Sequence, residues 1–331
     1  MPFIRRSQSR RAFARVVEAS DLTSSRLLLV ASTGGHLIEL HRLVEMWGGA
    51  PGALWVTFDT PQSRDLLRGL DVFYVPYVAP RDWKTVVAVA STLRALLRRQ
   101  RFDGMVSTGA AVALSAALAG LLTGTKMLYV ESIARTSGPS LTGRLLQLVP
   151  GVALRTQVES WSSSRWRFAG NVLQGYESVP VATAAVPAPM TLFVTLGTIA
   201  PYRFDSLVDK ALTAIDEDAT VTWQVGSTTR SDLPGDVSSA MSYEAVRAAM
   251  SRADVIVTHG GVGTILDALD SGKKPVIVPR RRHRGEHVDD HQEEFAALMA
   301  ASGLAVVVES PDLDGAILSA ALKERIRPTS P

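Results

Sequence analysis

The sequence contains no cysteine among its 331 residues. This absence excludes a disulfide framework, a thiolate metal site and a cysteine nucleophile, and it fits a reducing, cytosolic setting. Long apolar runs are also missing, because the longest, Ala110 to Leu122, is shorter than the ~20 residues that a membrane-spanning helix needs. The N-terminal region is polar and basic without an apolar core, so we expect neither a signal peptide nor an integral anchor.

Two familiar nucleotide-binding motifs are missing as well. The chain has no G-x-G-x-x-G turn and no phosphate-loop lysine motif, and Asp59 is the nearest candidate for an acid that reads a ribose. Hydride chemistry is therefore disfavoured. Asp312 and Asp314 have the spacing of a metal–diphosphate pair, but they precede a predicted helix, where aspartate is a common cap. We expect no essential metal and no cofactor.

Basic residues are unevenly distributed, although the formal net charge is only +3. Residues 1–25 are predicted to form a basic arm, and a second cluster runs from Arg280 to Arg284. Aromatic side chains are not interleaved with these charges, so we expect no nucleic acid partner. An anionic membrane surface or a phosphorylated substrate accounts for the charges. The predicted amphipathic helix Trp83–Arg99 packs on a sheet, or lies on anionic lipid.

Strands and helices alternate in both halves of the chain, which predicts two Rossmann-like α/β domains that face a cleft. We place an acceptor and membrane-associating domain at 26–178, a proline-rich linker at 179–190 and a nucleotide-binding domain at 191–327. Strands are expected at 27–31, 53–58, 72–75, 105–107, 127–130, 152–158, 172–173, 191–196, 220–225, 255–257, 275–278 and 305–308. Helices are expected at 37–47, 83–99, 110–122, 141–149, 204–215, 243–252, 290–301 and 313–326, with another after the glycines at 260–263.

The segment from Asp254 to Asp267 combines a short apolar strand, a glycine-rich turn and the start of a helix. Glycines let the backbone approach a ligand, and the free N–H groups of the helix start favour an anion such as a diphosphate. The alternative is a tight turn that only packs a helix on a sheet. Side chains at successive strand ends favour a nucleotide-sugar pocket, and the candidate residues are Gly197, Thr198, His259, Gly260, Gly261, Gly263, Thr264, Asp267, Asp290, His291, Gln292 and Glu293. Among these, His259 could donate to a phosphate oxygen as a neutral or charged imidazole, and Asp267 could accept from ribose hydroxyls.

The first half holds a similar strand and glycine turn, which ends in Thr33, Gly34, Gly35 and His36. Glu131 and Ser132 follow the strand at 127–130, where side chains face the ligand crevice of an open parallel sheet. Their alternative role is to cap a helix.

Three motifs of the second half, H-G-G-V-G-T-I-L-D-A-L, G-K-K-P-V-I-V-P-R and E-H-V-D-D-H-Q-E-E, resemble the donor domain of glycosyltransferase family 28. That family includes MurG and the catalytic subunit of the eukaryotic dolichol-linked N-acetylglucosaminyltransferase. V-T-L-G-T at Val194–Thr198 is similar to the family's first strand. S-T-G-G-H-L and Y-V-E-S-I-A-R-T resemble the partner subunit of the eukaryotic enzyme, so the two subunits look fused here. The bacterial exopolysaccharide pair PssD and PssE resembles the same two halves.

This resemblance implies the glycosyltransferase-B fold and a metal-independent, inverting transfer from a UDP-sugar to a polyprenyl-diphosphate-linked sugar. It places the enzyme at the inner face of the cell membrane, as a peripheral cytoplasmic protein. A base must then deprotonate the acceptor hydroxyl. We assign this role to His36, with Glu131 as the alternative base, although His36 could instead bind the lipid diphosphate. The acceptor side would use Thr33, Gly34, Gly35, Ser132, Arg280 and Arg282.

Two positions depart from the family pattern. Asp267 stands where the family often has a longer glutamate, and Glu293 stands where MurG has a second glutamine. A carboxylate at 293 would repel an acidic sugar, so N-acetylglucosamine or another uncharged hexose is favoured over glucuronate. Two rival functions remain: a UDP-sugar 2-epimerase of the same fold and a non-catalytic membrane scaffold.

Overall fold

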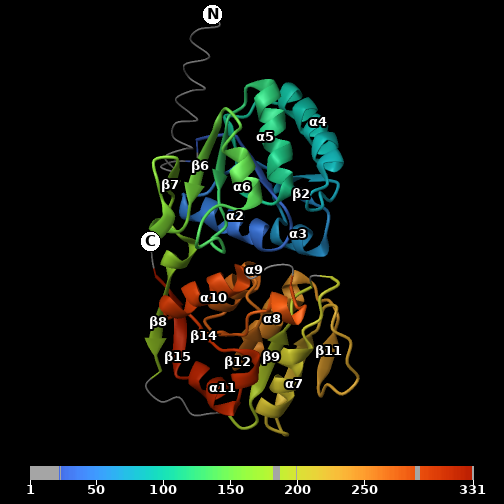
Figure 1. The fold of residues 1–331 in the computed structure, drawn as a ribbon, viewed down its shortest axis with the longest axis vertical. Coiled ribbons are helices and arrows are strands. Elements are labelled where there is room, and N and C mark those ends of the chain that lie inside the picture. The colour runs from blue at the N-terminus through green and yellow to red at the C-terminus, as the bar shows by residue number, and fades with distance from the viewer. Residues whose placement is uncertain (1–21, 23, 182–186, 199, 288–290, 330–331) are drawn as a thin grey trace, which may run out of the picture. The chain divides into compact units, whose positions relative to one another are not determined.

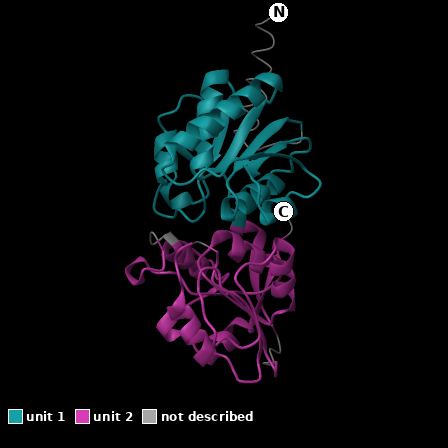
Figure 2. Ribbon diagram, turned by 90° about the vertical axis from the view of Figure 1, so that its right-hand side faces the viewer, with its two compact units in different colours: residues 1–172 teal, residues 173–331 magenta. Residues whose placement is uncertain are grey.

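The computed structural model describes residue 22 and residues 24–181, 187–198, 200–287 and 291–329. Most of the expected basic arm and part of the expected linker therefore lie outside the described residues. The chain divides into two compact units, residues 1–172 and 173–331 (Figure 2). Each unit contains its own parallel sheet, as predicted, but the division follows Val172, whereas the sequence analysis placed it after residue 178.

The first unit is built on a seven-stranded parallel sheet in the order β3-β2-β1-β4-β5-β6-β7 (Figure 1). Its strands are β1 Leu27–Ala31, β2 Leu54–Phe58, β3 Asp71–Val75, β4 Gly104–Gly109, β5 Met127–Val130, β6 Val152–Thr156 and β7 Trp166–Phe168. Its helices are α2 Gly35–Met46, α3 Pro61–Leu66, α4 Trp83–Arg99, α5 Ala111–Thr123 and α6 Leu141–Leu146. The central strand β1 is apolar and buried throughout, which is typical of a parallel strand covered on both faces.

Helices α4 and α5 lie side by side and cover one face of this sheet (Figure 1). The apolar face of α4 packs Val89, Leu93 and Leu97 into the core together with Leu28 and Val30 of β1. The side chain of Asp82 accepts a hydrogen bond from the Thr85 N–H and caps the start of α4. No helix among the described residues is long and apolar enough to cross a membrane.

The second unit contains a six-stranded parallel sheet in the order β11-β10-β9-β12-β13-β14 and a two-stranded antiparallel sheet of β15 and β8. Its strands are β8 Tyr176–Pro180, β9 Thr191–Thr195, β10 Thr220–Gln224, β11 Asp236–Ser238, β12 Val255–Thr258, β13 Val276–Ile277, β14 Val306–Val307 and β15 Glu324–Pro328. Its helices are α7 Asp205–Ala214, α8 Tyr243–Arg252, α9 Val262–Asp270, α10 His291–Ala301 and α11 Gly315–Ala321.

Several boundaries differ from the sequence predictions. The expected terminal helix 313–326 is wrong, because α11 ends at Ala321 and the chain continues as β15. Strand β15 is fixed by pairing with β8, a partner that is distant in sequence. The expected strand at 172–173 is instead the start of a short 3-10 helix, Val172–Gly175. Strands β7, β8 and β11 were not predicted; they are short or carry exposed polar residues and so lack an apolar run.

Candidate active site

The glycine turns of the second unit leave the sheet at the same edge. Strands β9 and β12 are parallel neighbours, and Thr195 pairs with Thr258 at their carboxyl ends. Gly197 and Thr198 follow the first strand, and the glycine turn beginning at Gly260 follows the second. The structure therefore brings together two segments that are more than 60 residues apart in sequence, at the edge where open parallel sheets bind ligands.

The imidazole of His259 fills the space between these turns. A β-carbon added to Gly197 would lie 2.6 Å from the His259 Nε2, and one added to Gly261 would lie 2.3 Å from the same atom. Both positions therefore require glycine. Burial, with the nearby charge of Arg280 as a second cause, lowers the pKa of His259 to about 3. The neutral ring is thus favoured over the charged form at physiological pH.

Helix α9 begins directly after these glycines and presents its first amides without a side-chain cap. Its N-cap residue is Gly261, which offers no oxygen to the first-turn N–H groups. Gly263 is buried, and Thr264 is half-buried in the first turn. Asp267, one turn further on, is 4% exposed and accepts a hydrogen bond of 2.9 Å from the hydroxyl of Tyr243 on α8. Tyr243 was not identified from the sequence.

Gln292 connects two strand ends instead of standing alone as a sugar-reading side chain. Its Oε1 accepts hydrogen bonds from the Gly260 N–H at 3.2 Å and the Arg280 N–H at 3.3 Å. A β-carbon on Gly260 would lie 2.7 Å from the Gln292 Cβ, so this contact also requires glycine. Asp290 lies outside the described residues, and His291 is the first residue of α10. These two assignments stay predictions.

Glu293 forms an ion pair with Arg281, so its charge is neutralised within the protein. Arg281 also pairs with Glu309, and Arg284 donates to Ser310. The expected repulsion of an acidic sugar by Glu293 is therefore weakened. Arg282 is exposed on the short 3-10 helix Arg282–Arg284. The segment is not a continuous patch of unpaired arginines.

The predicted role of Arg280 in acceptor binding does not fit the structure. The residue is completely buried and cannot clamp an acceptor at the surface. Its guanidinium donates four hydrogen bonds to main-chain carbonyl oxygens of Leu196, Tyr202, Arg203 and Glu286. The Arg280 side chain is enclosed, that of Arg281 is half-buried in ion pairs, and Arg282 is exposed. Sequence neighbours of one chemical type therefore have different roles.

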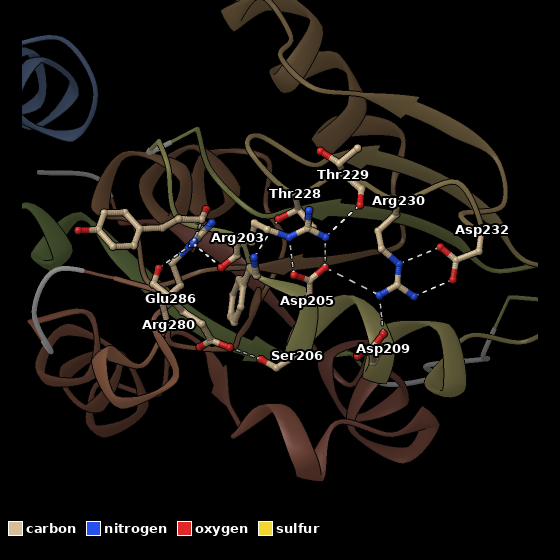
Figure 3. Close-up of polar contacts among 12 residues, drawn as sticks. Arg203, Asp205, Ser206, Asp209, Thr228, Thr229, Arg230, Asp232, Arg280 and Glu286 are labelled. Carbon is tan, nitrogen blue, oxygen red and sulfur yellow. Dashed lines mark hydrogen bonds and ion pairs between the residues drawn. The ribbon is translucent and has the colours of Figure 1, made fainter.

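The loops around Arg280 are held by a polar network that Figure 3 displays. Arg203 forms a bidentate pair with Asp205 at the start of α7. Arg230, on the loop after β10, pairs with Asp209 and Asp232. Ser206 donates a 2.5 Å hydrogen bond to Glu286, whose other oxygen accepts from the Arg281 N–H. These contacts tie the segments after β9, β10 and β13 to one another.

In the first unit, His36 lies in the first turn of α2, at the carboxyl edge of the sheet. A β-carbon on Gly109, at the end of β4, would lie 3.0 Å from the His36 Cε1. Thr108 donates a 2.7 Å hydrogen bond to the His36 carbonyl oxygen. Gly34 has a φ of 86°, which glycine tolerates, and its N–H donates to Gln62 at 2.7 Å. Thr33, Gly34, Gly35 and His36 are all half-buried.

Glu131 does not fit the role of alternative base. The residue is 1% exposed, and its Oε1 accepts from the Tyr129 hydroxyl at 3.0 Å. Its Oε2 accepts from both the N–H and the hydroxyl of Ser140, the N-cap of α6. A base must reach the hydroxyl that it deprotonates, whereas this carboxylate is enclosed and already engaged. A structural role, in which Glu131 holds the start of α6, is therefore favoured. Ser132 beside it is also buried.

Glu39 on α2 is a fully buried carboxylate that was not among the predicted site residues. Its Oε1 accepts from the Ile133 N–H at 2.6 Å and from the Gln157 side chain at 2.5 Å, while its Oε2 has no hydrogen-bond partner among the described residues. Burial raises its pKa from 4.5 to about 7. The available signal was a charged residue three positions after His36, between the buried Ile38 and Leu40 of an otherwise apolar helix face.

No group of three or more histidine, aspartate or glutamate side chains suited to a metal ion occurs in the described parts of the chain.

Comparison with known proteins links the second unit to a family. Residues 191–329 match the glycosyltransferase family 28 C-terminal domain. A relative from Burkholderia pseudomallei (strain 1106a), named UDP-N-acetylglucosamine--N-acetylmuramyl-(pentapeptide) pyrophosphoryl-undecaprenol N-acetylglucosamine transferase, is 25% identical over 91% of this chain and 88% of its own length. A protein of the same name from Chlorobium luteolum is 26% identical over 66% of this chain and 62% of its own.

Solved structures share the fold. Acinetobacter baumannii MurG has a TM-score of 0.51 at 16% identity and covers 89% of both chains. The glycosyltransferase SnogD from Streptomyces nogalater has a TM-score of 0.56 at 19% identity, with 90% of both chains covered. UDP-N-acetylglucosamine 2-epimerase from Rickettsia bellii has a TM-score of 0.55 at 12% identity and covers 90% of this chain and 86% of its own. The second unit thus matches a glycosyltransferase family 28 C-terminal domain, and the two Rossmann-like units share the glycosyltransferase-B fold of MurG and SnogD.

Proposed function

We propose that the protein is an inverting glycosyltransferase that moves a sugar from a UDP-sugar to a polyprenyl-diphosphate-linked acceptor in cell-surface polysaccharide or glycolipid synthesis. The observation that carries the proposal is the edge of the second sheet. There, two glycine turns emerge side by side next to the uncapped start of α9, within the segment that matches the family 28 domain. Such a site suits a diphosphate because unpaired N–H groups and the helix dipole favour negative charge.

On the donor side, the amides of the Gly261–Thr264 segment would hold the diphosphate, with Gly197 and Thr198 beside them. Gly260, whose N–H already donates to Gln292, would shape the turn. Asp267 would accept from the ribose hydroxyls. Asp290, His291 and Glu293 would bond the sugar hydroxyls, and Gln292 would hold the Gly260 turn against α10 through its hydrogen bonds. As the bond to the anomeric carbon breaks, negative charge grows on the leaving UDP, and pre-oriented N–H groups stabilise it.

On the acceptor side, His36 would take the proton from the attacking hydroxyl, and Thr33, Gly34, Gly35 and Ser132 would bind the lipid diphosphate. The structural support is that His36 lies in the first turn of α2, whose N-cap residue, Gly34, has no side chain that could cap the helix. Arg282 is the basic residue of the 280–284 segment that stays in this role, because it is exposed and Arg280 is not. No metal ion takes part in the proposed steps.

N-acetylglucosamine is the preferred sugar in this proposal. The sequence relatives are named as N-acetylglucosamine transferases, although they are only about a quarter identical. A glucuronate donor is disfavoured less strongly than the sequence suggested, because Arg281 neutralises Glu293.

A UDP-sugar 2-epimerase is the second candidate, because the Rickettsia bellii epimerase shares the fold as closely as the transferases do. The two functions differ in their need for an acceptor: an epimerase converts UDP-N-acetylglucosamine alone, whereas a transferase releases UDP only as a sugar is transferred.

Membrane attachment is proposed at the inner face of the cell membrane, as a peripheral cytoplasmic protein. Helix α4 exposes Trp83 and Val87 beside its basic residues, and the α6 region exposes Leu141, Leu145 and Leu148. Apolar side chains flanked by basic ones bind anionic lipid surfaces.

Two measurements test the proposed function. A panel of UDP-sugars is screened for thermal stabilisation, since a ligand that binds only the folded state raises the unfolding temperature. UDP release is then followed with and without a lipid extract. We expect stabilisation by UDP-N-acetylglucosamine and acceptor-dependent release of UDP; conversion of the nucleotide sugar without any acceptor would favour the epimerase instead.

A further inference from the structure

Arg280 carries a positive charge in the interior of the second unit. Its side chain is inaccessible to solvent, and its guanidinium contacts carbonyl oxygens at 2.6 Å (Leu196), 2.8 Å (Glu286), 3.1 Å (Tyr202) and 3.3 Å (Arg203). It also lies over the ring of Phe204, 4.8 Å from the ring centre. All these partners are neutral, and the described residues include no carboxylate that pairs with it directly. The carboxylate of Glu286, whose charge acts on Arg280, accepts instead from Ser206 (Figure 3).

A buried cation of this kind is unfavourable in the absence of a counter-charge. Burial lowers the pKa of Arg280 to about 10, partly opposed by the charge of Glu286. The guanidinium is therefore still charged at neutral pH. A buried arginine at this position therefore indicates a role for its hydrogen bonds or for its charge.

The hydrogen bonds of Arg280 act on the turn after β9. The peptide between Leu196 and Gly197 is trans, so its carbonyl and its N–H point in opposite directions. Because the Leu196 carbonyl points to Arg280, the Gly197 N–H points away from it. Gln292 links the backbone of Arg280 to the Gly260 turn as well. The Arg280 side chain thus holds the Gly197 turn from inside the unit, while the Gly260 turn is linked through Gln292 to the main chain at position 280.

The charge of Arg280 also reaches these turns. After burial, it is the largest cause that lowers the pKa of His259, whose ring fills the space between Gly197 and Gly261. A positive potential that disfavours a charged imidazole favours an anion at the same place. The two turns therefore lie in a positive field even though Arg280 is too deeply buried to touch a ligand.

We infer that Arg280 is a positioning residue that gives the donor site its preference for a nucleoside diphosphate, by orienting the Gly197 turn and by supplying positive charge from beneath it. This inference rests on the proposed function, because it takes the glycine turns as the place of the UDP diphosphate. The site would then select a negatively charged ligand through a buried arginine and not through an exposed arginine that contacts the ligand.

The experiment compares UDP with uridine, which lacks the diphosphate, in the full-length protein with R280M and R280K. UDP binding is titrated calorimetrically, and uridine is measured by competition against UDP. Methionine has similar length but no charge, whereas lysine keeps the charge and loses part of the hydrogen bonding. R327M is the matched control, since Arg327 is an exposed arginine of the same unit that pairs with Glu177.

In R280M we expect the affinity for UDP to fall at least tenfold more than the affinity for uridine, which corresponds to about 1.4 kcal/mol. R280K should keep most of the UDP-over-uridine preference even if both ligands bind more weakly, and R327M should leave it unchanged. Raising the salt concentration should reduce this difference between UDP and uridine less than it would reduce the effect of a surface charge.

Equal losses for UDP and uridine in R280M would overturn the inference and leave Arg280 a purely structural role. A preference in R280K as low as in R280M would also overturn it, and if R280M does not fold, the R280K result decides alone. A wild-type protein that does not bind UDP would instead reject the proposed function, so the two failures are distinguishable.

Discussion

Replacing Glu39 with glutamine should change how the stability of the protein depends on pH. The wild-type carboxyl is fully buried, and its pKa is about 7 in the folded state against 4.5 for an ordinary glutamate. Because this folded-state pKa is raised, the folded protein holds the proton more tightly than the unfolded chain. The associated stabilisation is complete below pH 4.5 and is lost as the pH rises through 7.

The magnitude follows from the two pKa values. Each pKa unit is worth about 1.36 kcal/mol, so the rise from 4.5 to about 7 corresponds to about 3 kcal/mol in full. Between pH 5 and pH 8 the wild-type protein should lose about 2 to 3 kcal/mol of stability from this group alone. Glutamine can still accept from the Ile133 N–H through its carbonyl oxygen but does not titrate. E39Q should therefore be close to the wild type at pH 5 and more stable at pH 8.

Urea unfolding of both proteins at pH 5, 6, 7 and 8, followed by tryptophan fluorescence, measures this difference. Five of the six tryptophans lie in the first unit with Glu39, so the signal reports mainly on that unit. Comparing the two proteins at each pH removes contributions that both share, including that of His259. E45Q, on the exposed end of the same helix, is the control and should show no comparable change. Parallel curves for wild type and E39Q would refute the reasoning.

Four further predictions concern the two sites and the membrane. D267A should weaken UDP binding roughly tenfold, the worth of a hydrogen bond to a charged group, and unchanged affinity in calorimetry would count against the ribose assignment. H36A should abolish sugar transfer while UDP binding stays nearly intact; a parallel loss of UDP affinity would assign His36 to the donor site or to the fold. G261A should destabilise the second unit or abolish UDP binding, because its β-carbon would overlap the His259 ring, and wild-type behaviour in both assays would contradict the packing. Liposome flotation should show binding to anionic vesicles that weakens with salt, whereas equal binding to neutral vesicles at high salt would indicate hydrophobic insertion instead.

The order of elements around the two glycine turns was predictable because local patterns determine it. Strand β12 was expected at 255–257 and spans Val255–Thr258, and β1 was expected where it occurs. In both cases a glycine follows within three residues of the end of an apolar run, which marks where a buried parallel strand ends. Strand β15 was missed because its pairing with β8 across most of the unit, not its own composition, keeps it extended.

The sites were harder to predict because burial decides the role of a charged residue. Arg280 and Arg282 look equivalent in the sequence, yet one is enclosed by carbonyl oxygens and the other is exposed. Glu131 and Glu39 show the same problem, since only tertiary packing reveals which carboxylates are enclosed. The glycines were identified correctly as special positions, but the packing reason, the His259 ring between Gly197 and Gly261, required the structure.

The most direct test of the central claim is transfer of a radiolabelled sugar from UDP-N-acetylglucosamine to a lipid. The purified protein is incubated with the labelled donor and a bacterial lipid extract, and the label is measured in the organic phase together with the UDP released. The account predicts label in the lipid phase equal in amount to the UDP produced, dependent on both protein and extract, and absent with H36A. UDP-sugar consumption with no label entering the lipid phase, across extracts and UDP-sugars that bind the protein, would contradict it.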